Sequence, residues 1–139
     1  MNRLTKKSVN EITYKIIGAA IEVHKNLGPG LLEQAYELCL EHELQVRGLK
    51  IERQQSVPVI YKGLILESKL RYDLLVEDCV LVELKAVAMM HAVFEAQLMT
   101  YMKLLKKPKG VLLNFFCTNI FKEGQYTFVN EFFRVLPDE

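Results

Sequence analysis

Apolar residues recur at helical spacing in the first third of the chain. Between positions 12 and 27 they return every three or four residues, which predicts a helix. The segment "SVNE" (8–11) has the Ser and Glu spacing of a capping box, and Gly28 is a natural stop. After "GPG" (28–30) a second helix is predicted over 31–47, ended by Gly48.

From Lys50 onward the apolar positions mostly follow the shorter period of strands. The predicted elements are a strand before the turn "YKG" (61–63), a hairpin of 69–76 and 80–86 around "EDC" (77–79), a helix over 91–107, a buried strand over 110–117 and a strand over 125–129. The resulting order, α-α-β-β-β-α-β-β, predicts an α/β (α+β) fold with helices against a central mixed β-sheet.

The composition is that of an ordinary globular protein. The 139 residues are half hydrophobic and a quarter charged, so we expect one domain over 1–139. A net charge of +1 neither favours nor excludes nucleic acid, because a local patch matters more than the total. The start "MNRLTKKSVN" lacks an apolar signal-peptide core and no run is long enough for a membrane helix. We therefore expect a cytoplasmic protein without membrane contact.

Two charged residues interrupt the apolar segment "VLVELKAV" (80–87). Glu83 and Lys85 point to one side of the predicted strand. The register that keeps both apolar faces together places Val76 opposite Val80 and therefore Asp73 opposite Glu83, with Arg71 opposite Lys85. Opposed Cβ atoms lie about 4.5–5.5 Å apart, where two carboxylates repel. A divalent cation between them would explain the pair, and so would an ion-pair network on a solvated face.

Two helices supply further candidates at helical spacing. Glu33 and Tyr36 share one face of the second helix, and Gln97 and Tyr101 share one face of the third. Each has a structural alternative, because Glu33 complements the helix dipole and a Gln commonly borders an apolar stripe.

These residues resemble a known family. "GLLEQAY" (30–36) fits the GxxExxY signature, and the resemblance extends over roughly residues 10–117, including "RYDLLVEDCVLVELKAV" (71–87) and "EAQLMTYMKLL" (95–105). GxxExxY proteins are grouped with the PD-(D/E)XK nuclease superfamily. The resemblance implies a restriction-endonuclease-like core, in which a mixed sheet is flanked by helices.

The resemblance also implies a metal site. Asp73 matches the motif aspartate, Glu83 and Lys85 match the (D/E)XK element, and Glu33 matches the acidic residue on the preceding helix. In that scheme Mg²⁺ or Mn²⁺ is bound by Asp73, Glu83, Glu33 and the Leu84 carbonyl. Lys85 would position or activate the attacking water.

Gln97 and Tyr101 are similar to the QxxxY element of one branch of these nucleases. In that branch Gln97 would help to anchor Lys85 or the phosphate. Two departures stand out: Tyr72 replaces the proline before the motif aspartate, and "KEGQYTF" (122–128) lacks a basic pair after the glycine.

The sequence thus favours a metal-dependent phosphodiesterase acting on nucleic acid, DNA in preference to RNA. We expect Arg71, Tyr36 and Tyr101 to contact the substrate. The alternative is a nucleic-acid- or protein-binding module that keeps the nuclease fold without cleaving. A third idea, a homodimer in which a partner completes the groove, would account for the modest positive charge.

Overall fold

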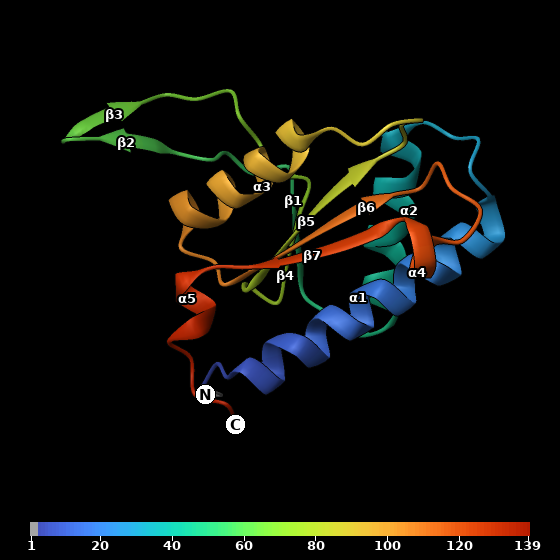
Figure 1. Ribbon diagram of the computed structural model, residues 1–139, viewed down its shortest axis with the longest axis horizontal. Helices are drawn as coiled ribbons and strands as arrows, with labels where there is room; N and C mark the ends of the chain where they lie inside the picture. The colour runs from blue at the N-terminus through green and yellow to red at the C-terminus, as the bar shows by residue number, and fades with distance from the viewer. Residues whose placement is uncertain (1–2) are drawn as a thin grey trace.

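The computed structural model describes residues 3–139, which fold into seven strands and five helices (Figure 1). In chain order these are α1 (Lys6–Leu27), α2 (Glu33–Val46), β1 (Ile51–Arg53), β2 (Val59–Tyr61), β3 (Leu64–Leu66), β4 (Leu74–Val76), β5 (Val80–Lys85), α3 (Ala92–Leu105), β6 (Lys109–Asn114), α4 (Ile120–Glu123), β7 (Gln125–Val129) and α5 (Glu131–Arg134).

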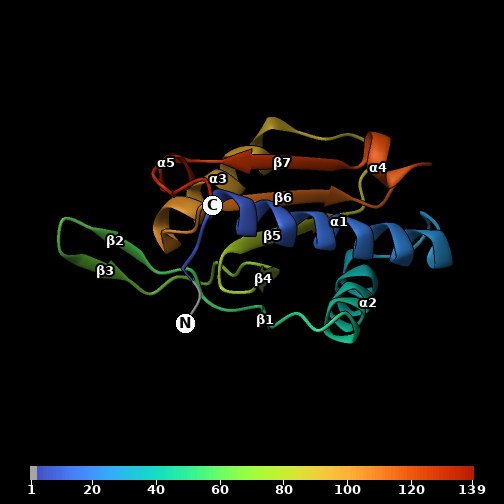
Figure 2. The ribbon, with the colours of Figure 1, turned by 90° about the horizontal axis from the view of Figure 1, so that it is seen from below.

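Five of the strands form one mixed sheet in the order β1-β4-β5-β6-β7. The β5–β6 pair is parallel and the other neighbours are antiparallel. Parallel neighbours need a crossover, and α3 supplies it on one face of the sheet. Helices α1 and α2 cover the opposite face (Figure 2). The predicted fold class, helices against a mixed sheet, is confirmed.

The central strand β5 is buried on both faces. Val80, Val82 and Leu84 pack toward α1 and α2, whereas Leu81 packs toward α3. This alternation confirms the predicted division of the strand into two faces. Tyr72 lies in the cluster against α3 and is not on the face of Leu74 and Val76, because the β4 ladder begins only at Leu74.

The first helix begins earlier than the capping box predicted at Ser8 and Glu11. Thr5 is the N-cap, and its side chain accepts a hydrogen bond from the Ser8 N–H (3.0 Å) while the Ser8 hydroxyl accepts one from the Thr5 N–H (2.9 Å). Ser8 is therefore the third residue of the helix (N3) in the capping box, and Thr5 takes the N-cap position. The predicted stop at Gly28 is confirmed by a positive φ of 73°.

Four short elements were missed: β1, β3, α4 and α5. Each spans three or four residues, too few for a periodic signal. The predicted turn at 61–63 is confirmed, with φ of 46° at Lys62 and 84° at Gly63, and it joins β2 to β3 as a separate two-stranded sheet. Within residues 3–139, no helix combines the length and apolarity that crossing a bilayer requires.

We predict that Gly124→Ala destabilises the fold while Gly30→Ala does not. A Cβ at Gly124 would collide with the backbone carbonyl oxygen of Asn114 and lie 2.9 Å from the Cys117 Sγ, whereas the space around Gly30 is open. The Asn114 backbone can shift only by disturbing the end of β6. We expect a loss of about 1–3 kcal/mol for Gly124→Ala and a change within about 0.5 kcal/mol for Gly30→Ala in urea unfolding. Equal stabilities would contradict this packing.

Candidate active site

The candidate site begins where the β4–β5 ladder ends. The paired residues are Leu74 with Val82, Leu75 with Leu81, and Val76 with Val80. The predicted register is therefore confirmed. The ladder stops before reaching Arg71, which forms an isolated bridge with Ser56 instead of pairing with Lys85.

The carboxylates of Asp73 and Glu83 accept hydrogen bonds from the opposite segment at the point where the next ladder pair would stand. The Asp73 N–H donates to Glu83 Oε2 (2.6 Å), and the Leu84 N–H donates to Asp73 Oδ2 (2.8 Å). Each carboxylate thus binds a backbone donor of the opposite segment. The two acidic side chains converge, as the register predicted.

Burial makes this convergence electrostatically costly. Glu83 is 6% exposed, and burial followed by the charge of Asp73 raises its pKa to about 8. Burial is the largest effect that raises the pKa of Asp73, to about 6, and the charge of Glu37 acts in the same direction. The Lys85 charge opposes both shifts. A further positive charge at this point would favour full ionisation of the pair.

Gln54, Glu37 and Arg53 extend the site and were missed from the sequence. The Gln54 Nε2 donates to Glu37 Oε1 (2.9 Å) and to Asp73 Oδ1 (3.2 Å), and so bridges the two carboxylates. Arg53 pairs with Glu37 at 2.8 Å. Gln54 has a positive φ of 55°, which turns its side chain out of the strand path. The one available signal was that Glu37 follows Glu33 by four residues, on the same helix face.

These residues line an open cleft of about 690 Å³ between the start of α2 and the sheet. Its lining comprises Leu31, Leu32, Glu33, Gln34, Glu37, Arg53, Gln54, Asp73 and Ala86. Glu33 is exposed as the first residue of α2, whereas Glu37 is 6% exposed and bound to Gln54. The structure thus brings Glu33 to the cleft of Asp73 and places Glu37 in the hydrogen-bonded network.

Lys85 lies beside the carboxylates at the end of β5. Its Nζ stands 4.5 Å from the centre of the Phe94 ring on α3, and its charge stabilises the ionised forms of Asp73 and Glu83. Such a cation–π contact restrains the ammonium without neutralising it. Lys85 is therefore available to bind an anion or a water molecule beside the two carboxylates.

Gln97 and Tyr101 approach the site from α3. The Gln97 Nε2 donates to the Tyr101 hydroxyl (3.0 Å), and Tyr101 is 3% exposed. Burial, and after it the charge of Glu83, raises the Tyr101 pKa. Gln97 thus hydrogen-bonds to Tyr101, whereas the Lys85 ammonium, which Gln97 was expected to anchor, lies over the Phe94 ring.

Tyr36 does not lie where the expected contact with substrate requires it to be. Its side chain is fully buried and stacks on Phe115 with ring centres 4.4 Å apart. Its hydroxyl donates to the Gly28 carbonyl and accepts from the Leu31 N–H (3.0 Å). A ring enclosed in this way cannot reach a substrate, and it instead holds the loop before α2. The predicted contact Arg71 is exposed, and its Nη1 donates to the Gln54 carbonyl (3.0 Å).

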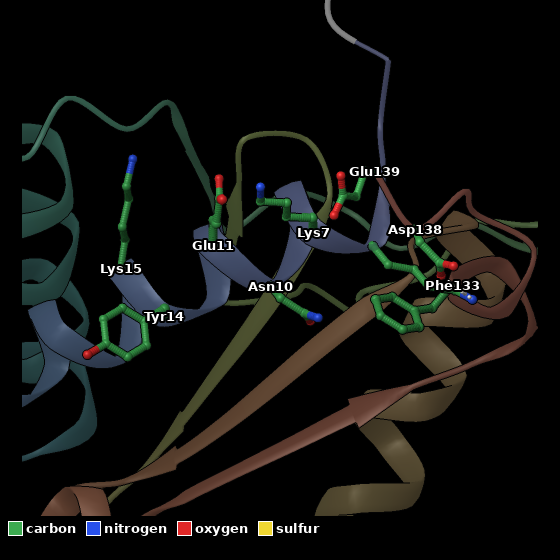
Figure 3. Close-up of a pocket in the computed structure, with 9 residues that line it drawn as sticks. Lys7, Asn10, Glu11, Tyr14, Lys15, Phe133, Asp138 and Glu139 are labelled. Carbon is green, nitrogen blue, oxygen red and sulfur yellow. Dashed lines mark ion pairs between the residues drawn. The ribbon is translucent and has the colours of Figure 1, made fainter.

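A second depression, of about 720 Å³, lies along α1 and the end of the chain (Figure 3). Lys7, Glu11 and Lys15 lie on one side of α1, and Asn10 and Tyr14 lie on the other. Its charges alternate in sign along the helix, so they do not converge on one point. We therefore place the candidate site at the cleft of Asp73.

The donors around Asp73 fit a hard cation. Two carboxylates converge there, and the Leu84 N–H points to Asp73. Because the N–H and C=O of one strand residue face the same neighbour, the Leu84 carbonyl points to this edge as well. Oxygen donors alone suit Mg²⁺ or Mn²⁺ better than zinc. Across residues 3–139, no group of three or more His, Cys, Asp or Glu side chains is arranged to hold an ion, so water or substrate would complete the coordination.

Comparison with known protein families gives a match over most of the chain. A family model described as the PD-(D/E)XK nuclease superfamily matches residues 10–126. The match names the superfamily and not the GxxExxY group, so that finer assignment stays a prediction. No curated protein and no solved structure matches the chain.

We predict that the stability of the metal-free protein falls with rising pH because of Asp73 and Glu83. Their raised pKa values, about 6 and about 8, stand above the values of roughly 4 in an unfolded chain. The folded state therefore binds more protons than the unfolded state between these limits, and the stability present at low pH is lost as pH rises through this window. Urea unfolding in a chelator, at about pH 5 and about pH 8, measures the fall.

The variant Glu83→Gln should reduce this fall, because the amide keeps the shape and removes the charge. Glu95→Gln, at an exposed carboxylate on α3, is the matched control and should retain the wild-type pH dependence. Parallel pH curves for wild type and Glu83→Gln would show that the pair is not electrostatically coupled to folding.

Proposed function

Because the chain belongs to the PD-(D/E)XK nuclease superfamily, we propose that it hydrolyses phosphodiester bonds in nucleic acid at the Asp73–Glu83 pair, with Mg²⁺ or Mn²⁺ as cofactor. Membership of the superfamily supports a nuclease-type function and a nucleic-acid substrate. The observation that carries the proposal is the convergence of the half-buried Asp73 and the buried Glu83, with Lys85 two residues beyond Glu83. Ordinary strand stability gives no reason to converge two carboxylates in this way.

Asp73, Glu83 and the Leu84 carbonyl are the groups that would hold the ion. When bound, such an ion lowers the pKa of a water molecule and stabilises charge on the phosphoryl oxygens. The raised pKa values of both carboxylates are consistent with a site that is completed by added positive charge.

Lys85 is the residue best placed to orient the reacting groups. Its charge lowers the pKa values of both carboxylates, and its ammonium can donate to the attacking water or to a phosphate oxygen. In hydrolysis the water oxygen bonds to phosphorus, the ester P–O bond breaks, and the departing oxygen takes up a proton. The Phe94 ring limits the positions open to Lys85, which favours one geometry for this step.

One hydrogen-bonded group positions Asp73. Gln54 donates to both Glu37 and Asp73, and so fixes Asp73 from the side of α2. Support of this kind keeps ligand side chains in one orientation. Arg71, exposed beside Gln54, is the residue we propose for contact with the substrate backbone.

One observation favours a second candidate function, a binding module that does not cleave. Arg53, the arginine that lines the cleft, is already ion-paired with Glu37 and Glu41. A cleft whose arginine is neutralised attracts phosphate weakly. A module of this kind would bind nucleic acid or protein in the presence of Mg²⁺ without cleaving it.

We predict that Asp73→Asn and Glu83→Gln abolish cleavage, with losses of at least about a thousandfold, and remove Mg²⁺ binding measured by calorimetry. Lys85→Met should lower the rate by about a hundredfold or more while leaving ion binding largely intact. Lys103→Met, at an exposed lysine on α3, is the control and should cleave normally. Single-stranded, duplex and branched DNA are tested first, and the same forms of RNA follow.

The outcomes separate the two functions. Cleavage by Asp73→Asn at the wild-type rate would place the chemistry elsewhere and refute the proposal. A wild-type protein that binds nucleic acid and Mg²⁺ but cleaves none of the substrates would favour the binding module.

The roles of Glu37 and Glu33 can be distinguished by a matched pair of variants. We predict that Glu37→Gln weakens Mg²⁺ binding by about tenfold, because the Glu37 charge acts on both Asp73 and Glu83. Glu33→Gln, at the exposed rim, should weaken it by less than about threefold. If Glu33→Gln instead weakens Mg²⁺ binding more than Glu37→Gln does, the carboxylate that α2 contributes to the metal site is that of Glu33, as the family resemblance implies.

A further inference from the structure

The β2–β3 hairpin, here termed the arm (59–66), presents apolar side chains on both of its faces. The register pairs Val59 with Leu66, Ile60 with Ile65, and Tyr61 with Leu64, so the middle pair faces one way and the outer pairs face the other. The most exposed of these side chains are Ile60 (61%), Tyr61 (61%), Leu64 (56%), Ile65 (70%) and Leu66 (46%). Both ribbon views show the arm projecting from the body of the protein (Figures 1 and 2).

The base of the arm is firmly attached. The Val57 N–H donates to the Leu70 carbonyl (2.9 Å), and the Tyr72 N–H donates to the Gln55 carbonyl (3.2 Å). Val57 and Tyr72 are themselves buried in the cluster against α3. Beyond this base, the two strands of three residues pair only with each other. An isolated two-stranded hairpin is marginally stable in water, so the arm would gain from a covering surface.

We propose that the arm is the surface through which two copies of this chain associate. The five side chains leave roughly 600 Å² of each copy uncovered. Burying on the order of 1,200 Å² in a dimer requires both faces of each arm to be covered, one by the partner's arm and the other by the body of the partner. That area lies at the lower end of what stable protein interfaces bury. The inference stands independently of the proposed function.

The chemistry of the arm favours a second copy over nucleic acid. Its eight residues contain one charged side chain, Lys62 at the tip, which is too little to bind phosphates. A ribbon with free edges and apolar faces is complementary to itself, and a two-fold axis brings identical surfaces together. A net charge of +1 offers little repulsion against such pairing.

The test is sedimentation velocity over a wide range of protein concentrations. Reducing buffer prevents disulfide formation through the exposed Cys39. The wild type should form a dimer, and Ile60→Glu/Ile65→Glu should weaken association at least about a hundredfold through charge repulsion at the interface. Val46→Glu/Val135→Glu is the matched control, since these side chains are 68% and 80% exposed outside the arm, and it should remain dimeric.

A second variant guards against a folding defect. Tyr61→Ser/Leu64→Ser adds no charge and changes the other face of the arm, and it should also weaken the dimer. Circular dichroism and thermal unfolding report whether each variant stays folded. The proposal is overturned by a monomeric wild type, or by folded arm variants that remain dimeric. It is likewise overturned if the wild type is monomeric and the arm variants lose binding to a short DNA duplex, which would assign the arm to nucleic acid.

Discussion

The candidate site depends on one reciprocal exchange of hydrogen bonds. Glu83 accepts from the backbone of Asp73, and Asp73 accepts from the backbone of Leu84. The exchange takes the place of the next β4–β5 pair, so the ladder ends while its donors stay satisfied. The two carboxylates meet for the same reason. The end of the ladder, the buried charge of Glu83 and the cleft beside Asp73 therefore all follow from these two hydrogen bonds.

The packing of β5 makes that arrangement rigid. The strand is covered by α1 and α2 on one face and by α3 on the other, so Glu83 cannot turn outward to water. A buried carboxylate held in one orientation is unfavourable for folding and useful for binding a cation. Lys85 lies at the end of the strand, where burial decreases, and its charge acts on both carboxylates.

The sequence predicted the register of the β4–β5 hairpin but not the residues that surround its carboxylates. Alternating apolar residues and a three-residue loop leave one sensible register, which brings Asp73 to Glu83. Glu37 was missed because a Glu on an amphipathic helix usually faces solvent. Its partners Arg53 and Gln54 stand at the end of a strand that is too short to show a period, and directly after it. Tyr36 had the right spacing for a site residue, but the loop at 28–31, whose shape no spacing rule predicts, encloses it.

The base of the arm separates it mechanically from the site. The chain leaves the sheet after Gln54 and returns at Asp73, and the Gln54 N–H binds the Asp73 carbonyl (3.0 Å), so this excursion is closed before the arm begins. A segment whose ends are already fixed can change in length at small entropic cost to the rest of the fold. The arm is thus a natural position for insertion or replacement: an unrelated peptide or a small domain could be grafted there while the carboxylates keep their places.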